Sequence, residues 1–282
     1  MFRNNYDNDS VTFSPQGRIF QVEYAAEAQP TDHAVISRPP VSDPDPEDYL
    51  NSELTSDALP PPQRNAEELS SYQKKLFAVD EHVGLAIAGL TSDARVLSNF
   101  MKQQCLSQRL TYDRAMPLGT LVSLIGDKAQ TNTQHYGKRP YGVGLLVAGV
   151  DDAGPHLFEF QPSGLTQEMV ACAIGARSQM ARTYLEKNID AFAACGRDEL
   201  VRHGLRALKE TLVQDRELTV ENTSVGVVGL PQQEGADGKK KGLEFFKVYD
   251  GAEVKDWINS VGDEAEAATN EGEGEGTSMQ VD

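Results

Sequence analysis

Apolar runs and amphipathic stretches alternate along the chain in an order that predicts both strands and helices. Residues 84–89 (GLAIAG) and 143–150 (VGLLVAGV) are almost continuously apolar, which is typical of strands buried on both faces. Residues 76–83 should form a hairpin with the first run through an Asp80-Glu81 turn. A partner strand for the second run is expected at 156–160, followed by a third strand around 169–174.

Apolar residues spaced by three and four predict four helices among these strands. The first should be capped by Thr91 or Ser92, and the second should follow Pro117. The third helix should have an apolar face that consists of Met180, Ala181, Tyr184 and Leu185. The fourth helix should be capped near Asp198. Strands at 224–230 and 244–249 and a short helix at 254–258 complete the pattern.

The order of these elements predicts the fold class. Strands come first, then two helices, then strands, two helices and strands again. Helices grouped in pairs around antiparallel strands favour an α+β fold, a four-layer α/β/β/α sandwich, over a parallel βαβ arrangement.

The start of the chain has the pattern of an ordered segment. In SPQGRIFQVEYA, Pro15 and Gly17 favour a tight turn. The apolar spacing beyond it predicts a helix that begins near Arg18. An ordered turn and helix at this position suggest that the segment has a function.

Residues 29–63 differ from their surroundings. They contain eight of the fourteen prolines, and seven acidic residues against the single base Arg38. Because such a stretch offers few backbone donors and little apolar surface, we expect an irregular acidic Pro-rich insert.

Charge and cysteine content narrow the functional classes. The net charge of −17 argues against nucleic-acid binding, and seven acidic residues between positions 263 and 282, without a base, predict a disordered acidic tail. The three cysteines have no CxxC spacing and are expected to be reduced packing residues of an intracellular protein. No apolar run approaches the ~20 residues of a membrane span, so we expect no membrane partner.

Candidate catalytic and ligand sites are scarce in the sequence. The five histidines show no metal-ligand spacing, and neither a Walker motif nor a dinucleotide loop occurs. Ser178 lies beside Arg177 but has no evident base. We therefore expect no catalytic residue, no metal and no cofactor.

Several segments in order resemble one family. They are Tyr6-Asp7, SPQGRIFQVEYA, LTSDARVL (90–97), RPYGVGLLVAG (139–149) and IGARSQMARTYLE (174–186). Together they resemble the α subunits of the 20S proteasome, most of all the α-type-1 subunits of fungi and other eukaryotes. The likeness covers residues 1–28 and 64 to about 260 and implies the N-terminal-nucleophile hydrolase sandwich.

The resemblance implies a non-catalytic ring subunit that functions in ubiquitin-dependent protein degradation in the cytoplasm and nucleus. Its α and β neighbours would form a hetero-oligomeric core of twenty-eight subunits, and tails of regulatory-particle ATPases and other activators would dock on the ring. The alternative is a free-standing N-terminal-nucleophile hydrolase, which would need a processed N-terminal Thr, Ser or Cys.

The resemblance also assigns roles to individual residues. Tyr6, Asp7, Pro15 and Tyr24 match the family positions that cluster between neighbouring subunits and hold the axial gate open. Lys75 matches the lysine that pairs with the terminal carboxylate of an activator tail. The implied organisation is a gate segment (1–17), an α-subunit domain (18–260) interrupted at 29–63, and an acidic tail (261–282).

The insert is where the chain departs from the family, because two core strands are normally found there. Two explanations are open: a gene model in which intron sequence replaced an exon, or a divergent isoform with a rebuilt sheet. On either explanation we expect the chain to be less stable than its family and to be incorporated poorly.

Overall fold

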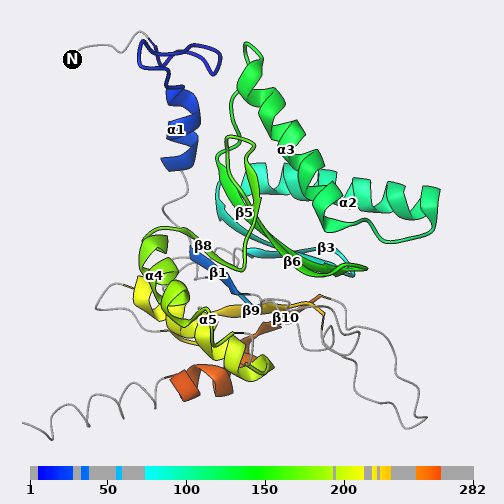
Figure 1. Ribbon diagram of the computed structural model, residues 1–282, viewed down its shortest axis with the longest axis vertical. Helices are drawn as coiled ribbons and strands as arrows, with labels where there is room; N and C mark the ends of the chain where they lie inside the picture. Colours follow the sequence, from blue (N-terminus) through cyan, green and yellow to red (C-terminus); the bar gives the residue numbers. More distant parts are fainter. Residues whose placement is uncertain are drawn as a thin grey trace, which may run out of the picture.

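The computed structural model of the chain (Figure 1) describes residues 6–27, 33–37, 55–58, 74–192, 195–212, 218–220, 223–229 and 246–261. Residues 33–37, 55–58 and 197 are described by their backbone alone. The expected acidic tail and most of the Pro-rich segment lie outside the described residues.

The described helices and strands follow the expected order. They are α1 (Phe20–Glu27), β1 (His33–Ser37), β2 (Thr55–Ala58), β3 (Leu76–Asp80), β4 (Val83–Gly89), α2 (Thr91–Tyr112), α3 (Leu118–Gln134), β5 (Val143–Asp151), β6 (Gly154–Phe160), β7 (Thr166–Glu168), β8 (Ala171–Gly175), α4 (Ser178–Asn188), α5 (Arg197–Thr211), β9 (Ser224–Val227) and β10 (Lys247–Asp250). A 3₁₀ turn, η2 (Gly251–Val254), continues as α-helix to residue 261.

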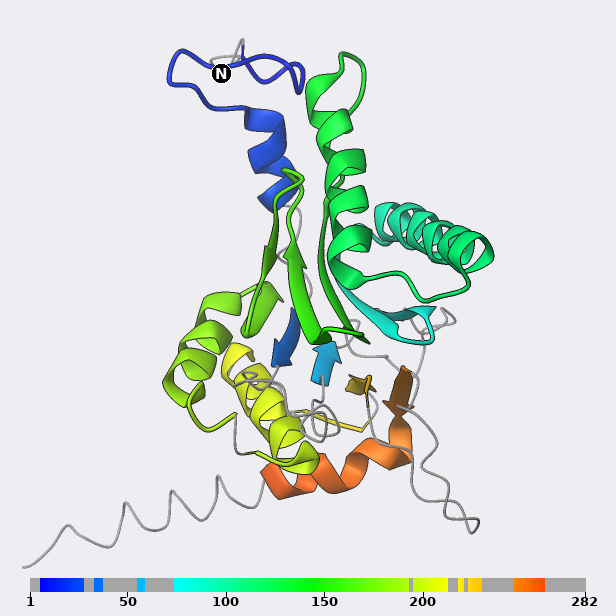
Figure 2. The same ribbon diagram turned by 45° about the vertical axis from the view of Figure 1, so that its right-hand side comes forward.

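Two antiparallel sheets lie face to face between two helical layers (Figures 1 and 2). One has the strand order β3-β4-β5-β6-β7 and is covered by α2 and α3. The other has the order β10-β9-β2-β1-β8 and is covered by α4, α5 and the C-terminal helical turns. The predicted four-layer α/β/β/α sandwich is confirmed.

Burial on both faces explains the continuous apolar runs. In β4, Leu85 and Ile87 pack under the α2–α3 layer, whereas Ala86 and Ala88 face the second sheet. Side chains alternate between the faces of a strand, so a strand between two apolar layers needs apolar residues at every position. The small alanines allow the two sheets to approach each other.

The strand predicted at about 169–174 is confirmed as β8, which begins two residues later, but the short strand β7 before it was not predicted. The chain pairs with β6 as β7, leaves that sheet at Met169 and Val170, and enters the other sheet as β8. The β7 sequence, Thr-Gln-Glu, contains no apolar residue, so an apolar pattern does not predict it.

The helix expected to begin near Arg18 is confirmed within two residues, whereas the N-cap residues expected for two other helices are wrong. The first helix begins at Phe20, because the Arg18 amide donates to the Ser14 hydroxyl within the preceding turn. The N-caps of α2 and α5 are Leu90 and Gly196 rather than the hydroxyl and carboxyl residues expected there. Leu90 is held instead by its own backbone, with its amide donating to the Gly142 carbonyl over 2.9 Å.

The expected apolar face of α4 is buried only in part. Ala181 and Leu185 are buried against the sheet, and Tyr184 packs beside them. Met180, in contrast, is exposed. A buried stripe of two residues and a flanking aromatic ring is sufficient for an eleven-residue helix on the surface of a sheet.

The segment 29–63 was expected to be irregular, and for two of its stretches this is wrong. The β1 strand pairs with β8 on one side and with β2 on the other, and β2 pairs with β9. The two strands therefore occupy the interior of the second sheet. Backbone pairing requires no apolar side chain, which is why a composition rich in Pro and Asp concealed these strands.

No helix among the described residues is long and apolar enough to cross a membrane.

Candidate functional site

The N-terminal arm, residues 6–27, begins with a well-defined turn. The Gly17 amide donates to the Ser14 carbonyl over 2.9 Å, and Gly17 has a φ of +79° that favours glycine. Ser14 also accepts from the Arg18 amide through its hydroxyl and donates to the Arg18 carbonyl through its own amide. The turn predicted from Pro15 and Gly17 is confirmed, with the buried Ser14 as its centre.

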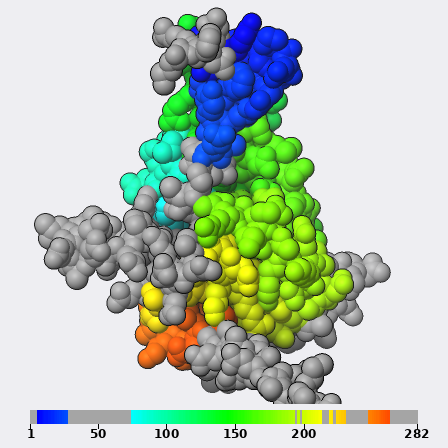
Figure 3. All heavy atoms as spheres, turned by 90° about the vertical axis from the view of Figure 1, so that its left-hand side faces the viewer, coloured from blue at the N-terminus to red at the C-terminus, as the bar shows by residue number. Residues whose placement is uncertain are grey.

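A second serine anchors the arm to the body of the molecule. Ser10 is 1% exposed, and its hydroxyl contacts the carbonyl oxygens of Asn132 at 3.3 Å and Lys138 at 3.0 Å, at the end of α3 and just beyond. The Gln21 side chain donates to the Asp7 carbonyl and so ties the start of the arm to α1. Figure 3 shows the arm at one end of the molecule, standing above the rest of that face.

The four residues assigned to the gate are spread along this arm. Tyr6 and Tyr24 are 42% and 43% exposed, Pro15 is exposed and Asp7 is half-buried. Phe13, which sequence reasoning did not single out, is the most exposed aromatic side chain of the arm. The gate role assigned to these four residues depends on contacts between neighbouring subunits, and it stays a prediction.

Lys75 lies at the edge of the body, immediately before β3. Its residue is only 5% exposed, whereas the adjacent Lys74 is exposed. The Lys75 carbonyl accepts from the Ile87 amide over 3.1 Å, which fixes the backbone next to β4. Sequence reasoning did not foresee this burial, and the docking role of Lys75 stays a prediction.

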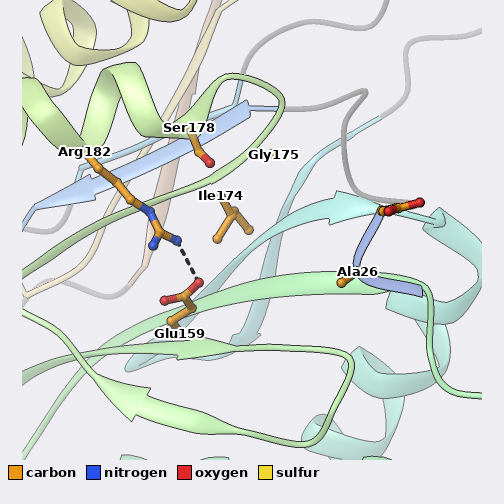
Figure 4. Close-up of a pocket in the computed structure, with 7 residues that line it drawn as sticks. Ala26, Glu159, Ile174, Gly175, Ser178 and Arg182 are labelled. Carbon is orange, nitrogen blue, oxygen red and sulfur yellow. Dashed lines mark hydrogen bonds and ion pairs between the residues drawn. The ribbon is translucent and has the colours of Figure 1, made fainter. Parts of the chain in front are cut away.

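A cavity of about 520 Å³ opens where α1, the two sheets and α4 meet. Figure 4 shows Glu159 from β6 and Arg182 from α4 directed toward each other across it, with Ser178 above. Ala26 and Glu27 from the end of α1, together with Ile174 and Gly175 from β8, complete the lining.

The charged groups of this cavity are already paired. Arg182 donates to Glu159 over 2.9 Å and to the Ala173 carbonyl over 2.9 Å, and the Glu159 side chain is 6% exposed. This ion pair joins β6 of one sheet to the helix that covers the other. Removing one partner of such a pair leaves an uncompensated charge, so the pair holds the two halves together.

Nucleophiles near the cavity are not activated. Burial, with the Glu159 carboxylate adding to it, raises the pKa of the Cys172 thiol to about 12, so Cys172 stays protonated. Ser178 shares the lining with an ion pair and no histidine. Among the described residues, this cavity therefore has the arrangement of a structural junction and not of a hydrolytic centre.

Comparison with known proteins identifies the class. Residues 63–228 match the proteasome subunit family, and residues 6–28 match the N-terminal signature of proteasome subunits of the A type. The chain belongs to the proteasome subunit family, and within it to the α type.

Individual relatives are similar along almost the whole chain. The chain is 48% identical to a probable alpha type-6 proteasome subunit of Schizosaccharomyces pombe, over 95% of this chain and 89% of the relative. It is 47% identical to the alpha type-6 proteasome subunit of Saccharomyces cerevisiae, over 92% of this chain and 100% of the relative. It is 43% identical to the alpha type-1 proteasome subunit of Dictyostelium discoideum, over 92% of this chain and 95% of the relative.

The family fixes the general role. The α subunits of the 20S core are its non-catalytic structural subunits, and they assemble with the other proteasome subunits. The resemblance, the N-terminal-nucleophile hydrolase fold and the absence of a peptidase role are thereby confirmed. The alternative of a free-standing hydrolase is set aside by the α-type signature at residues 6–28.

Proposed function

We propose that the N-terminal arm of this subunit gates substrate entry into the 20S core and that Lys75 receives activators. The gate cluster in this proposal is Tyr6, Asp7, Pro15 and Tyr24. The partners are the neighbouring α and β subunits of the core and the C-terminal tails of regulatory-particle ATPases and other activators. The protein would function in the cytoplasm and the nucleus, in ubiquitin-dependent degradation.

One observation carries the gating proposal: the arm is ordered but held by few contacts. Its helix α1 buries no residue, and Ser10 supplies the described bonds from the arm to α3 and the loop beyond it. Exposed aromatic side chains at Tyr6, Phe13 and Tyr24 leave apolar surface for a neighbouring subunit to cover. A segment with few internal contacts can change its position at a low free-energy cost, as a gate requires.

Ser10→Ala tests the gate in assembled core particles. The substitution removes a hydroxyl that contacts two carbonyl oxygens and should loosen the arm by about 1–2 kcal/mol. We expect faster hydrolysis of a small fluorogenic peptide without activator. Ser123→Ala is the control, because Ser123 is exposed and, within the described part of the chain, its hydroxyl bonds only the Gly119 carbonyl of its own helix. Unchanged basal hydrolysis, despite faster amide exchange in residues 6–19, would contradict the gating role.

Lys75 supports the docking proposal through its chemistry and position. A terminal carboxylate needs a cation in a partly dry environment, and a charged hydrogen bond there contributes about 1.5–3 kcal/mol. Since Lys75 is buried in the single chain, an activator tail can reach its ammonium group only if the groups that cover it move. Docking at this lysine would therefore be coupled to a local rearrangement.

Lys75→Ala and Lys74→Ala form a matched pair for this proposal. Lys75→Ala should weaken activator-stimulated peptide hydrolysis about tenfold or more while the core particle still assembles. The exposed Lys74→Ala should leave stimulation unchanged. Native mass spectrometry checks assembly, and Lys75→Arg tests the need for the charge. Equal stimulation of the Lys75→Ala particle and the unchanged particle would overturn the docking role.

A further inference from the structure

Three potential metal ligands meet at the junction between α4 and α5. They are the thiol of Cys195, the carboxylate of Glu199 and a ring nitrogen of His203, and their ligand atoms all lie within 4.8 Å of one another. The two helices lie side by side on the outer layer of the molecule (Figures 1 and 2), far along the chain from the arm and Lys75. None of the roles described so far uses this cluster.

The spacing of the three residues explains why they meet. Glu199 and His203 are four residues apart in α5, so they lie on one face, one turn above the other. Cys195 precedes the helix by two residues and lies four residues before Glu199. The spacing of the histidines alone does not reveal this C-x₃-E-x₃-H pattern, because each of its three ligands is a different residue type.

The surroundings hold the imidazole in a defined orientation. The Tyr184 hydroxyl lies 2.9 Å from His203 Nδ1, and the Phe192 ring packs edge-on with its centroid 5.3 Å from that of His203. Histidines that bind metals commonly have such a hydrogen-bond partner and a tightly packed ring. Cys195 and Glu199 are more accessible than the buried His203, which leaves one side open to solvent.

The electrostatics of the cluster suit a divalent cation. Glu199 lies close to both the Cys195 thiol and the His203 ring, and Arg206 lies close to the ring as well. Burial, with the Glu199 carboxylate adding to it, raises the pKa of Cys195, so a bound cation has to displace the thiol proton. A thiolate and a carboxylate would supply two negative charges and Arg206 one positive charge close by. The net charge facing a bound cation would therefore be negative.

We propose that Cys195, Glu199 and His203 form a binding site for a zinc-type divalent cation. Thiolate, carboxylate and imidazole are the ligands that Zn²⁺ selects, and a water molecule would occupy the fourth tetrahedral position. Zinc bonds of about 2.0–2.3 Å require the ligand atoms to be about 3.3–3.8 Å apart, so side-chain movements of about 1 Å close the site. On binding, the Cys195 thiol releases its proton to solvent.

The consequence for the fold is local. A metal held by these residues fastens the end of the α4–α5 connection to the first two turns of α5. His203 contacts Tyr184 of α4 and Phe192 of the connection. Fixing His203 at a metal would therefore also restrict the movement of α4 relative to α5. The site would thus stabilise this helical layer.

Cobalt(II) is a direct probe of the site in the full-length chain. A tetrahedral Co²⁺ site with one thiolate gives visible d–d bands and a sulfur-to-cobalt charge-transfer band in the near ultraviolet. Cys105 and Cys172 are both buried, whereas Cys195 is partly exposed, so that band reports Cys195. We expect it to saturate at one equivalent of Co²⁺ and to disappear when Zn²⁺ is added.

Substitutions assign the ligands. Cys195→Ser should abolish the charge-transfer band, and Glu199→Gln and His203→Gln should each weaken Co²⁺ binding at least tenfold. Glu210→Gln is the matched control, because Glu210 is an exposed acid at the other end of α5. Circular dichroism verifies that each variant is folded. Absence of the band in the unchanged chain, or its persistence in Cys195→Ser, would overturn the proposal.

A second measurement needs no variant. Zn²⁺ should slow alkylation of Cys195 by iodoacetamide at least tenfold, as read by mass spectrometry of the Cys195 peptide, and added chelator should restore the rate. If Zn²⁺ bound only to exposed carboxylates, the alkylation rate of Cys195 would not change. An unchanged alkylation rate would therefore count against the site.

Discussion

At the scale of single residues, Asp93 shows how one carboxylate can join two segments that are far apart in the sequence. Its oxygens accept from Arg139 over 2.6 and 2.9 Å and from the Gly142 amide over 3.0 Å, while its side chain is 8% exposed. These bonds hold the start of α2 against the loop before β5. The hydrogen bonds from Arg139, together with that from Gly142, lower the pKa of Asp93 despite its burial.

Asp93→Asn should lower the free energy of unfolding by about 1–3 kcal/mol. The amide keeps the shape but cannot accept both Arg139 bonds and the Gly142 bond with a full charge. Urea unfolding followed by circular dichroism measures the change. Asp152→Asn, an exposed neighbour of the β5–β6 turn, is the control and should have little effect.

The unchanged chain and the Asp93→Asn variant should also differ in how their stability depends on pH. Because the pKa of Asp93 is lower in the folded chain than its ordinary value of about 3.9, its contribution is complete above that value and is lost as the pH falls through the folded pKa. The stability difference between the unchanged chain and Asp93→Asn should be constant from neutral pH down to about 5 and shrink below about 4. A difference that grows on acidification would be inconsistent with this pairing.

Residue types were easier to predict than residue partners. The turn at Ser14 and Gly17 was predictable because its conformations are local. The burial of Lys75 and the bonds of Asp93 were not, since they depend on segments that fold next to them from far along the chain. The same holds for the contact between Tyr184 and His203.

At the scale of elements, the glycines of this fold differ in what they permit. A Cβ on Gly149 in β5 would lie 2.4 Å from the His82 carbonyl oxygen and 2.9 Å from the Leu118 side chain. A Cβ on Gly119 in α3 would meet no atom within 4 Å. Gly149 therefore permits β5 to lie close to His82 and to the start of α3, whereas Gly119 has no such packing role.

Gly149→Ala should destabilise the chain by about 1–3 kcal/mol, because the backbone at His82 would have to move. Gly119→Ala should stabilise it by up to about 1 kcal/mol, because alanine is the better helix former. Thermal unfolding of the two variants compares the same chemical change at two sites. Shifts of the same sign would show that these contacts do not set the effect.

The strands β1 and β2 make the clearest element-scale prediction. Val35 lies opposite Ala173 of β8 on one side and Asp57 of β2 on the other. Its backbone amide therefore points toward a paired strand on whichever side it is directed. Val35→Pro removes that donor and should increase amide exchange in residues 171–175, while amides of β4 and β5 keep their protection. Free exchange of residues 171–175 in the unchanged chain would contradict the pairing.

Most elements could be predicted from the period of their apolar residues, and the exceptions have a common cause. The α2, α3 and β5 segments have long, consistent patterns. The β1 and β2 segments lack such a pattern. They are held in the sheet by backbone hydrogen bonds, which nearby prolines and acidic residues do not prevent. The polar β7 strand was missed because it has no apolar residue, whereas β8 has an apolar sequence and was predicted.

At the scale of the whole molecule, the layer order followed from the element order, whereas the functional surfaces did not. Pairs of helices flanking strands leave few ways to bury two sheets, so the sandwich was predictable. The gate and docking roles concern contacts between subunits, which the apolar pattern of one chain does not specify. The metal-ligand cluster arises where three side chains converge on one helical face.

The completed second sheet changes the expectation for assembly. The sequence predicted poor incorporation because two core strands were thought to be lost. Since β1 and β2 fill the interior of that sheet, we now expect the chain to enter core particles. Co-expression with an affinity-tagged α neighbour, followed by native mass spectrometry, tests this. Particles that exclude the chain would show that the rebuilt sheet does not support assembly.

The lack of any buried residue in α1 has a consequence for how assembly can be observed. A helix of eight residues is marginal in water without tertiary support. The solitary subunit should therefore unwind α1 often, and enclosure by adjacent subunits should suppress this unwinding. The decrease in deuterium uptake at residues 20–27 therefore reports ring closure without any added fluorophore or tag.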